Sequence, residues 1–213
     1  MLITISRQYG AGGSEVARLV AARLGWTVVD NDIVDRVAQR AGLAADVVKR
    51  QDERVPGFVE RLARALTASS QEYAVPELGI AVREDEPSLV HITERVVHEL
   101  ADEGRVVLVG RAAPAVLGTS LDALHVKLVA PRDFRIRFAQ QAEGLDHRAA
   151  EKMMDETDAN RARYYREYYG RDWDDPTHFH MLLNTGLLGI DEAVAIVVRE
   201  AEARGWTRSP TRG

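Results

Sequence analysis

Cysteine is absent from the 213 residues of this chain. Its absence excludes a disulfide-stabilised scaffold, a thiol nucleophile and a metal site with cysteine ligands. The sequence also lacks any run of about 18 uncharged apolar residues, which excludes a membrane-spanning helix, and we expect no membrane partner. The first seven residues have no basic segment followed by a long apolar stretch, so we expect no secretory signal and a cytoplasmic location.

Lysine is scarce as well, because only three of the 28 basic residues are lysines and the rest are arginines. The formal net charge of −5 argues against a protein built mainly to neutralise a nucleic-acid backbone. The arginine- and tyrosine-rich stretch at 161–169 has the composition to stack on single strands, but its acidic neighbours weaken that interpretation. Nucleic acid is therefore not expected as a partner, and any anion site must be local.

Five short apolar segments alternate with segments of helical periodicity. The segments that predict strands are 2–6, 26–30, 105–111, 124–130 and 179–183. This alternation predicts a mostly parallel five-stranded sheet with helices on both faces, which is a three-layer α/β/α architecture. The length fits one such domain with an insertion or lobe.

Two long segments between the predicted strands have helical spacing. One covers 33–70 and is followed by a surface excursion at 70–88, and the other is a polar helix over 147–169. The amphipathic part at 44–69 fits a homodimer surface and burial inside an insertion equally well.

A glycine-rich loop follows the first strand. Gly10, Gly12 and Gly13 stand between this strand and a helical segment that starts at Ser14. Glycines let backbone N–H groups converge on phosphate oxygens, and the N-terminal end of a helix favours an anion. In the usual P-loop spacing, Gly-x4-Gly-Lys-Ser/Thr, Arg7 replaces the first glycine and Gly13 replaces the lysine.

Two other interpretations of this loop stay open. Gly10-x-Gly12, with Asp30 at the end of the second strand, also begins a dinucleotide-binding fingerprint. That fingerprint lacks its third glycine, because Glu15 stands there and its carboxylate would repel a pyrophosphate. In the second interpretation, the loop is a glycine turn that serves packing alone. We favour the variant of the mononucleotide P-loop.

The carboxyl ends of the parallel strands are the ligand-binding edge of such a sheet. The residues expected at this edge are Arg7 to Ser14, Asp30 to Arg36, Gly110-Arg111, Ala130 to Arg132 and Asn184-Thr185. Asp30 either ligates a metal or offsets the dipole of the helix that follows it. Asn184 and Thr185 either contact a base or cap a turn.

The same loop, together with later motifs, occurs in one known family. The matching residues are Ile3 to Ser14, Leu24-Gly25-Trp26, Asp30, Val109-Gly110-Arg111, His125 to Pro131, Arg161 to Tyr165, Asp172-Trp173 and Leu183-Asn184-Thr185. On these residues the chain resembles the cytidylate-kinase-like family of P-loop nucleoside monophosphate kinases. The resemblance implies a P-loop NTPase-type fold with ATP and Mg²⁺ as cofactors and nucleotides as substrates, and the glycine-glycine-serine form of the loop is a trait of that family.

The resemblance also implies an organisation of the chain. Residues 1–205 would form a single kinase-like domain, and 206–213 would be a flexible tail. Within the domain, 31–88 would be the helical insertion that binds the nucleoside monophosphate, and 140–175 would be the lid.

On the donor side, the resemblance implies roles for the loop and the lid. Ser14 would bind Mg²⁺ through its hydroxyl. The phosphates of the donor would be held by Gly10, Ala11, Gly12 and Gly13. The lid residues that fall over the transferring phosphoryl group are Asp158, Arg161 and Arg163.

On the acceptor side, the resemblance assigns Asp30 and Arg36 to the binding site. Gly110-Arg111 resembles the pair that grips the acceptor phosphate. The aspartate expected next is Ala112, which puts the preference for cytidine nucleotides in doubt.

Arginine must supply the positive charge that the missing lysine would have provided. The transition state of phosphoryl transfer spreads negative charge over equatorial oxygens, so catalysis depends on positioning and cations. We expect Arg7 or a lid arginine to compensate for Gly13. The other arginines that could approach the loop in space are Arg111, Arg132, Arg161 and Arg163.

The sequence therefore predicts a phosphotransferase that moves a phosphoryl group from ATP to a nucleoside monophosphate, with CMP or dCMP favoured. One alternative is a kinase for another small-molecule acceptor. The second is a nucleotide-binding regulatory protein without turnover, because the lysine and the aspartate are both missing.

Overall fold

A computed structural model of the chain describes residues 1–30, 89–118 and 122–206. The chain divides into two compact units, one of residues 1–30 and 97–213 and one of residues 31–96. The first unit contains the predicted sheet and loop. The expected insertion at 31–88, with Arg36 and the amphipathic segment at 44–69, lies outside the described residues, as does most of the tail.

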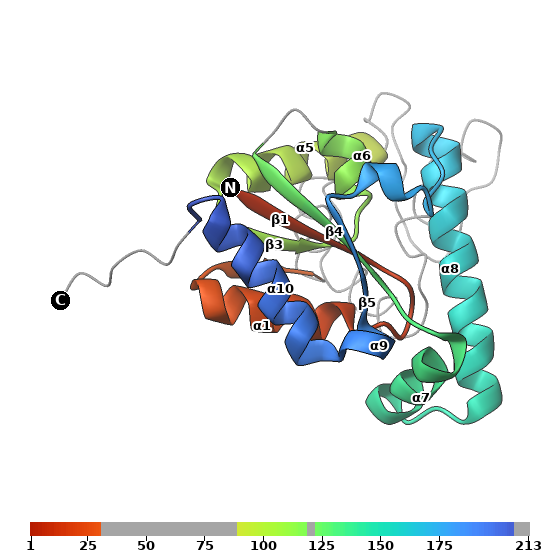
Figure 1. Ribbon diagram of the computed structural model, residues 1–213. Coiled ribbons are helices and arrows are strands. Elements are labelled where there is room, and N and C mark those ends of the chain that lie inside the picture. The colour runs from red at the N-terminus through yellow and green to blue at the C-terminus, as the bar shows by residue number, and fades with distance from the viewer. Residues whose placement is uncertain (31–88, 119–121, 207–213) are drawn as a thin grey trace, which may run out of the picture. The chain divides into compact units, whose positions relative to one another are not determined.

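All five predicted strands are present and form one parallel sheet. The strands are β1 (Leu2–Arg7), β2 (Thr27–Val29), β3 (Val106–Val109), β4 (Ala123–Val129) and β5 (Met181–Asn184). Their order across the sheet is β2-β3-β1-β4-β5, with β1 in the centre (Figure 1). Pairing aligns Leu2 of β1 with Val106 of β3 and with Ala123 of β4. The central strands are covered on both faces, which explains their continuous apolar sequences.

The described helices alternate with the strands. They are α1 (Gly13–Leu24), α5 (Leu89–Glu103), α6 (Ala113–Leu117), α7 (Arg132–Glu143), α8 (His147–Tyr169), α9 (Thr185–Leu188) and α10 (Ile190–Ala203). The polar helix predicted over 147–169 is confirmed as α8, which Asp146 caps by accepting the Ala149 N–H and which ends before Gly170. In the described ranges, no helix combines the length and the apolar character needed to cross a membrane.

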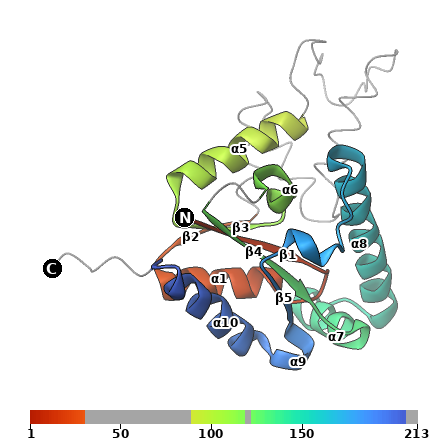
Figure 2. The same cartoon turned by 45° about the horizontal axis from the view of Figure 1, so that its top comes forward.

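The helices form two layers around the sheet, so the predicted three-layer fold is confirmed. Helices α1 and α10 pack together on one face, over a core that includes Ile3, Ile5 and Val126 (Figure 2). Helix α6 and the end of α5 lie on the other face. Helix α8 runs past the carboxyl ends of β1 and β4 in both views, which puts it beside the expected ligand edge.

The last strand begins later than predicted. Asp175 accepts a hydrogen bond from the backbone N–H of Thr177 and caps a short 3-10 helix at Pro176–His178. This turn takes up the residues just before Phe179, and the strand starts at Met181.

A buried polar seam lies on the face of the sheet opposite α1. Its centre is Lys127 of β4, whose side chain is 1% exposed and whose Nζ donates to the carbonyl of Trp173 and to Asp174 Oδ1, both at 2.6 Å. The ammonium also lies 4.2 Å from the centre of the Trp173 ring. Beside it, the buried His125 ring bonds to Thr4 Oγ1 at 2.7 Å. The seam ties the segment after α8 to the sheet.

Candidate active site

The loop between β1 and α1 has a backbone that requires glycine at two positions. Gly10 and Gly12 have φ angles of 75° and 73°, in the left-handed region that side chains disfavour. A Cβ at Gly10 would lie 2.4 Å from the carbonyl oxygen of Arg135. The loop therefore turns tightly under α7 and leads directly into the N-terminal end of α1, where an anion is favoured.

Thr185 holds this loop against the sheet. Its buried hydroxyl lies 3.0 Å from the carbonyl oxygen of Ala11 and 3.3 Å from that of Val129. Its neighbour Asn184 accepts the N–H groups of Gly186 and Leu187 with its side chain and so caps α9. Of the two roles left open by the sequence, the turn cap is the one that the contacts of Asn184 show.

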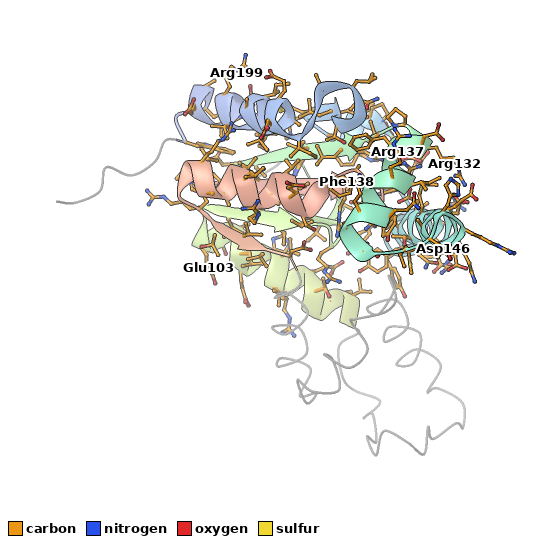
Figure 3. The ribbon with its side chains drawn as sticks, turned by 90° about the horizontal axis from the view of Figure 1, so that it is seen from below. Glu103, Arg132, Arg137, Phe138, Asp146 and Arg199 are labelled. Atoms are coloured by element: carbon orange, nitrogen blue, oxygen red, sulfur yellow. The ribbon has the colours of Figure 1, made fainter. Side chains whose placement is uncertain are left out.

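A cavity of about 400 Å³ opens above the loop. The loop forms its floor, and α7 forms an apolar wall with Phe138, Ala139 and Ala142. Phe138 lies between α7 and the start of α1 (Figure 3). The polar lining includes Arg7 and Arg161, with Glu15 and Glu143 as the two carboxylates.

Arg7 extends from the end of β1 across the floor of the site. Its Nη2 lies 3.8 Å from Asp30 Oδ1, at the end of β2. Burial lowers the pKa of the Arg7 guanidinium, and the negative charge of Asp30 opposes this shift. An arginine remains charged under such conditions because its ordinary pKa is so high.

Ser14 and Asp30 provide two oxygen ligands next to the loop. The Ser14 hydroxyl donates to Asp30 Oδ2 at 2.6 Å. Mg²⁺ prefers oxygen ligands and is commonly held by one or two protein groups together with substrate phosphates. The pair therefore fits Mg²⁺ bound jointly with a nucleotide. In the part of the chain that the structure describes, no group of three or more histidines or carboxylates could hold a metal alone.

Helix α8 binds the loop through Asp158 and Arg161. Asp158 Oδ1 accepts the backbone N–H of Tyr9 at 2.8 Å, and its other oxygen forms an ion pair with Arg135 of α7. Arg161 Nη1 donates to the carbonyl of Arg7 at 2.9 Å and lies 3.4 Å from Asp158 Oδ1. These contacts bring α7 and α8 to the same loop.

Two half-buried guanidinium groups thus share the site. Burial and the positive charge of Arg7 together lower the pKa of Arg161 to about 9, although the nearby Asp158 and Asp30 carboxylates act to raise it. Like charges destabilise each other in a desolvated setting unless an anion lies between or beside them. Asp30 and Asp158 offset part of this charge. The two guanidinium groups provide donors for an anion on the loop side of the cavity, which Glu15 and Glu143 also line.

The other predicted arginines lie elsewhere. Arg163 is two positions from Arg161 on α8, which turns it to another face of the helix, and its Nη2 donates to Asn160 at 2.8 Å. Arg132 binds Asp155 and Glu151 at the surface of the same helix pair. Neither lines the cavity.

Arg111 follows β3 in a strained stretch of backbone. Arg111 and Ala112 have φ angles of 59° and 50°, which non-glycine residues rarely adopt. Ala112 is buried in a cluster with Tyr165 and Trp173. The position at which the resemblance implies an aspartate therefore packs against aromatic side chains.

Several residues of the site were not predicted. Arg135 and Phe138 belong to no motif, and Tyr9 and Thr185, although expected at the ligand edge, were assigned no role in holding the loop. Burial raises the pKa of Tyr165 to about 12, and this phenol lies near Arg7. The alternation of arginine with apolar residues in α7 was the only signal for Arg135, and it does not distinguish inward from outward arginines.

Comparison with known proteins identifies the family of this chain. The model of the cytidylate kinase-like family matches residues 2–187. A cytidylate kinase from Halobacterium salinarum is 29% identical over 206 residues, which cover 95% of this chain and 90% of that protein. A cytidylate kinase from Methanopyrus kandleri is 31% identical over 124 residues, which cover 54% of this chain and only 64% of that protein.

Solved structures show the same fold at low sequence identity. An uncharacterised protein from Eubacterium ventriosum superposes with a TM-score of 0.68 and 21% identity, covering 96% of this chain and 99% of that one. A shikimate kinase from Bacteroides thetaiotaomicron gives a TM-score of 0.53 and 15% identity, covering 95% and 98%. These similarities concern the fold alone.

Proposed function

We propose that this chain, which belongs to the cytidylate kinase-like family, transfers a phosphoryl group from ATP to a nucleoside monophosphate with the help of Mg²⁺. Family and fold are those of a nucleoside monophosphate kinase-like phosphotransferase. The observation that carries the proposal is the pair of half-buried guanidinium groups, Arg7 and Arg161, beside a glycine loop and a cavity. CMP and dCMP are the acceptors to test first.

In this proposal the loop binds the phosphates of the donor. The backbone N–H groups of Gly10, Gly12 and Gly13 and the N-terminal end of α1 would face the anion, whereas the N–H of Ala11 donates to the carbonyl of Gln8 within the loop. The apolar wall of α7, with Phe138, covers one side of the cavity and limits the access of water. Asp158 acts as a positioning residue, because it accepts the Tyr9 N–H and forms ion pairs with Arg135 of α7 and Arg161 of α8.

Ser14 and Asp30 would hold Mg²⁺ together with the phosphates. When bound there, the ion supplies positive charge beside the phosphate oxygens. The hydrogen bond between the two residues keeps their oxygens next to each other beside the loop.

Transfer then requires an acceptor phosphate oxygen in line with the donor. This oxygen forms a bond to the terminal phosphorus as the bond to the bridging oxygen breaks, and ADP leaves. Arg161 would stabilise the charge on the equatorial oxygens. Arg36, Arg111 and Asp30 are proposed to hold the acceptor, and Arg163 remains a predicted lid residue.

A kinase for a different small acceptor is the second candidate. The buried contacts of Ala112 with Tyr165 and Trp173 support it, because this position offers no carboxylate to a base. A nucleotide-binding regulatory protein without turnover is the third. The cytoplasmic location and the homodimer remain predictions.

One experiment separates these functions. ADP release is measured with Mg²⁺ and ATP over a panel of CMP, dCMP, UMP, AMP and GMP, with a no-acceptor control. We expect the largest turnover with CMP or dCMP. Turnover with none of the five, but with another phosphorylatable metabolite, would favour the second candidate, and ATP binding without any turnover would favour the third.

A further inference from the structure

The P-loop position that normally carries lysine is Gly13, and the structure gives a reason for this glycine. We infer that Arg7 of β1 supplies both the space-filling stem and the positive charge of the missing lysine, and that it acts as a catalytic residue on the phosphates of the donor. This inference rests on the proposed function and names the cation that the donor site requires.

Gly13 is a glycine because of space and not because of backbone conformation. It is the first residue of α1, and unlike Gly10 and Gly12 it does not have a positive φ. A Cβ built at Gly13 would lie 2.5 Å from Cγ of Arg7 and 2.9 Å from its Cβ. The stem of Arg7 therefore occupies the room that a side chain at position 13 would need.

The guanidinium of Arg7 is accommodated by a second glycine. A Cβ built at Gly110, at the end of β3, would lie 2.3 Å from Nη1 of Arg7. Two glycines from separate connections thus leave a channel for one side chain that starts on β1. Arg7 crosses this channel and ends near Asp30.

The position also explains why the cation is an arginine. Burial lowers the pKa of Arg7 and of its neighbour Arg161, and a lysine in the same setting would lose its proton more easily because its ordinary pKa is lower. The Asp30 oxygen lies 3.8 Å from Nη2, which is too long for a hydrogen bond. This carboxylate therefore does not use up the donors of the guanidinium.

The ligand that fits this cation is the polyphosphate tail of a nucleotide. Arg7 lines the cavity together with the loop glycines and Arg161, so its donors and the loop N–H groups serve the same anion. A planar guanidinium can bind two phosphate oxygens at once.

Moving the charge back to the loop tests the inference. Binding of inorganic tripolyphosphate, and separately of ATP with Mg²⁺, is measured by calorimetry for five variants of the full chain. They are Arg7→Met, Arg7→Ala, Gly13→Lys, the double variant Arg7→Ala with Gly13→Lys, and the control Arg18→Met. Arg18 is an exposed arginine of α1 outside the cavity.

We expect Arg7→Met to keep the stem and lose the charge, and to bind tripolyphosphate about ten- to a hundredfold more weakly. Gly13→Lys alone should lose binding as well, because its side chain collides with Arg7. The double variant should bind more tightly than Arg7→Ala, because the alanine clears the channel and the lysine restores the charge. Arg18→Met should bind as the wild type does.

Three results would overturn the inference. They are tripolyphosphate binding by Arg7→Met at wild-type strength, wild-type binding by Gly13→Lys alone, and a double variant no better than Arg7→Ala. Circular dichroism and thermal unfolding identify any variant that fails to fold, and the folded variants then decide.

The probe needs no acceptor, so this test is separate from that of the proposed function. If the wild type binds tripolyphosphate through Arg7 but phosphorylates no monophosphate, the inference stands and the proposed function fails. If the wild type does not bind tripolyphosphate, the inference fails whatever the turnover measured.

Discussion

Two cations on neighbouring strands, one buried and one half-buried, show how differently the same sheet uses positive charge. Lys127 of β4 is 1% exposed, and two oxygens of the protein bind its Nζ at 2.6 Å. Arg7 of β1 has its Asp30 partner at 3.8 Å, a second guanidinium nearby and a cavity beside it. A cation whose hydrogen-bond donors are used by the protein is part of the scaffold. A cation beside a cavity that keeps donors available indicates a ligand.

The largest effect is expected on turnover, from a change at Arg161 beside the cavity. In the proposed reaction, replacing Arg161 by methionine removes charge that the transition state needs, and we expect turnover to fall about 10³-fold or more. Steady-state ADP release over acceptor concentration measures the loss. Arg166→Met, an exposed arginine of the same helix, is the matched control and should keep wild-type turnover. Equal losses in the two variants would contradict a specific role for Arg161.

The opposite result is expected for Lys127. Lys127→Met leaves the buried carbonyl of Trp173 without its donor, which should lower the free energy of unfolding by about 1–3 kcal/mol. Tripolyphosphate binding should stay at the wild-type level. Urea unfolding and calorimetry provide the two readings. A Lys127 variant that unfolds normally but loses anion binding would erase the distinction between the two cations.

Acid should weaken the seam around Lys127 before it affects the arginines. Burial lowers the pKa of His125 and of His180, and Arg204 also lowers that of His180. Nδ1 of His180 accepts the backbone N–H of His125 at 2.9 Å, so a proton there removes a hydrogen bond. Because the folded pKa lies below the unfolded value of about 6.5, this stability is present above pH 6.5 and is lost as the pH falls.

The measurement is the urea midpoint between pH 7.5 and pH 5. His180→Asn keeps an acceptor that does not titrate, and its midpoint should fall less steeply than that of the wild type. His98→Asn, an exposed histidine of α5, should follow the wild type. The same slope in the wild type and in His180→Asn would show that His180 does not contribute.

The smallest effect is expected at Asp174. Its side chain is 62% exposed although it binds the buried Lys127. Water can replace most of such a contact, so Asp174→Asn should lower the free energy of unfolding by less than about 1 kcal/mol. A loss as large as that of Lys127→Met would mean that the carboxylate, and not the Trp173 carbonyl, anchors the lysine.

Most of the fold was predictable because it depends on local sequence. The strands are short apolar runs, and α8 has an aspartate before its first turn and a glycine after its last. The glycine loop was also predictable, since Gly10 and Gly12 are needed for its backbone.

The assignment of arginines was not predictable in the same way. Arg161 and Arg163 lie in one motif, and only the docking of α8 on Tyr9 and Arg7 determines which of them faces the loop. Arg135 reaches Asp158 from another helix, a contact between positions far apart in the chain. The link between Arg7, Gly13 and Gly110 needs three separate segments, and spacing along the sequence does not contain it.

The hydroxyl of Thr185 has a consequence for the entropy that the loop would lose on binding a ligand. It connects the glycine loop to the end of β5 and to β4 at the same time. The loop is therefore already ordered before a nucleotide arrives, and little conformational entropy is lost when one binds. Amide hydrogens of the loop should exchange slowly with deuterium in the nucleotide-free protein, and replacing the threonine by valine should speed their exchange.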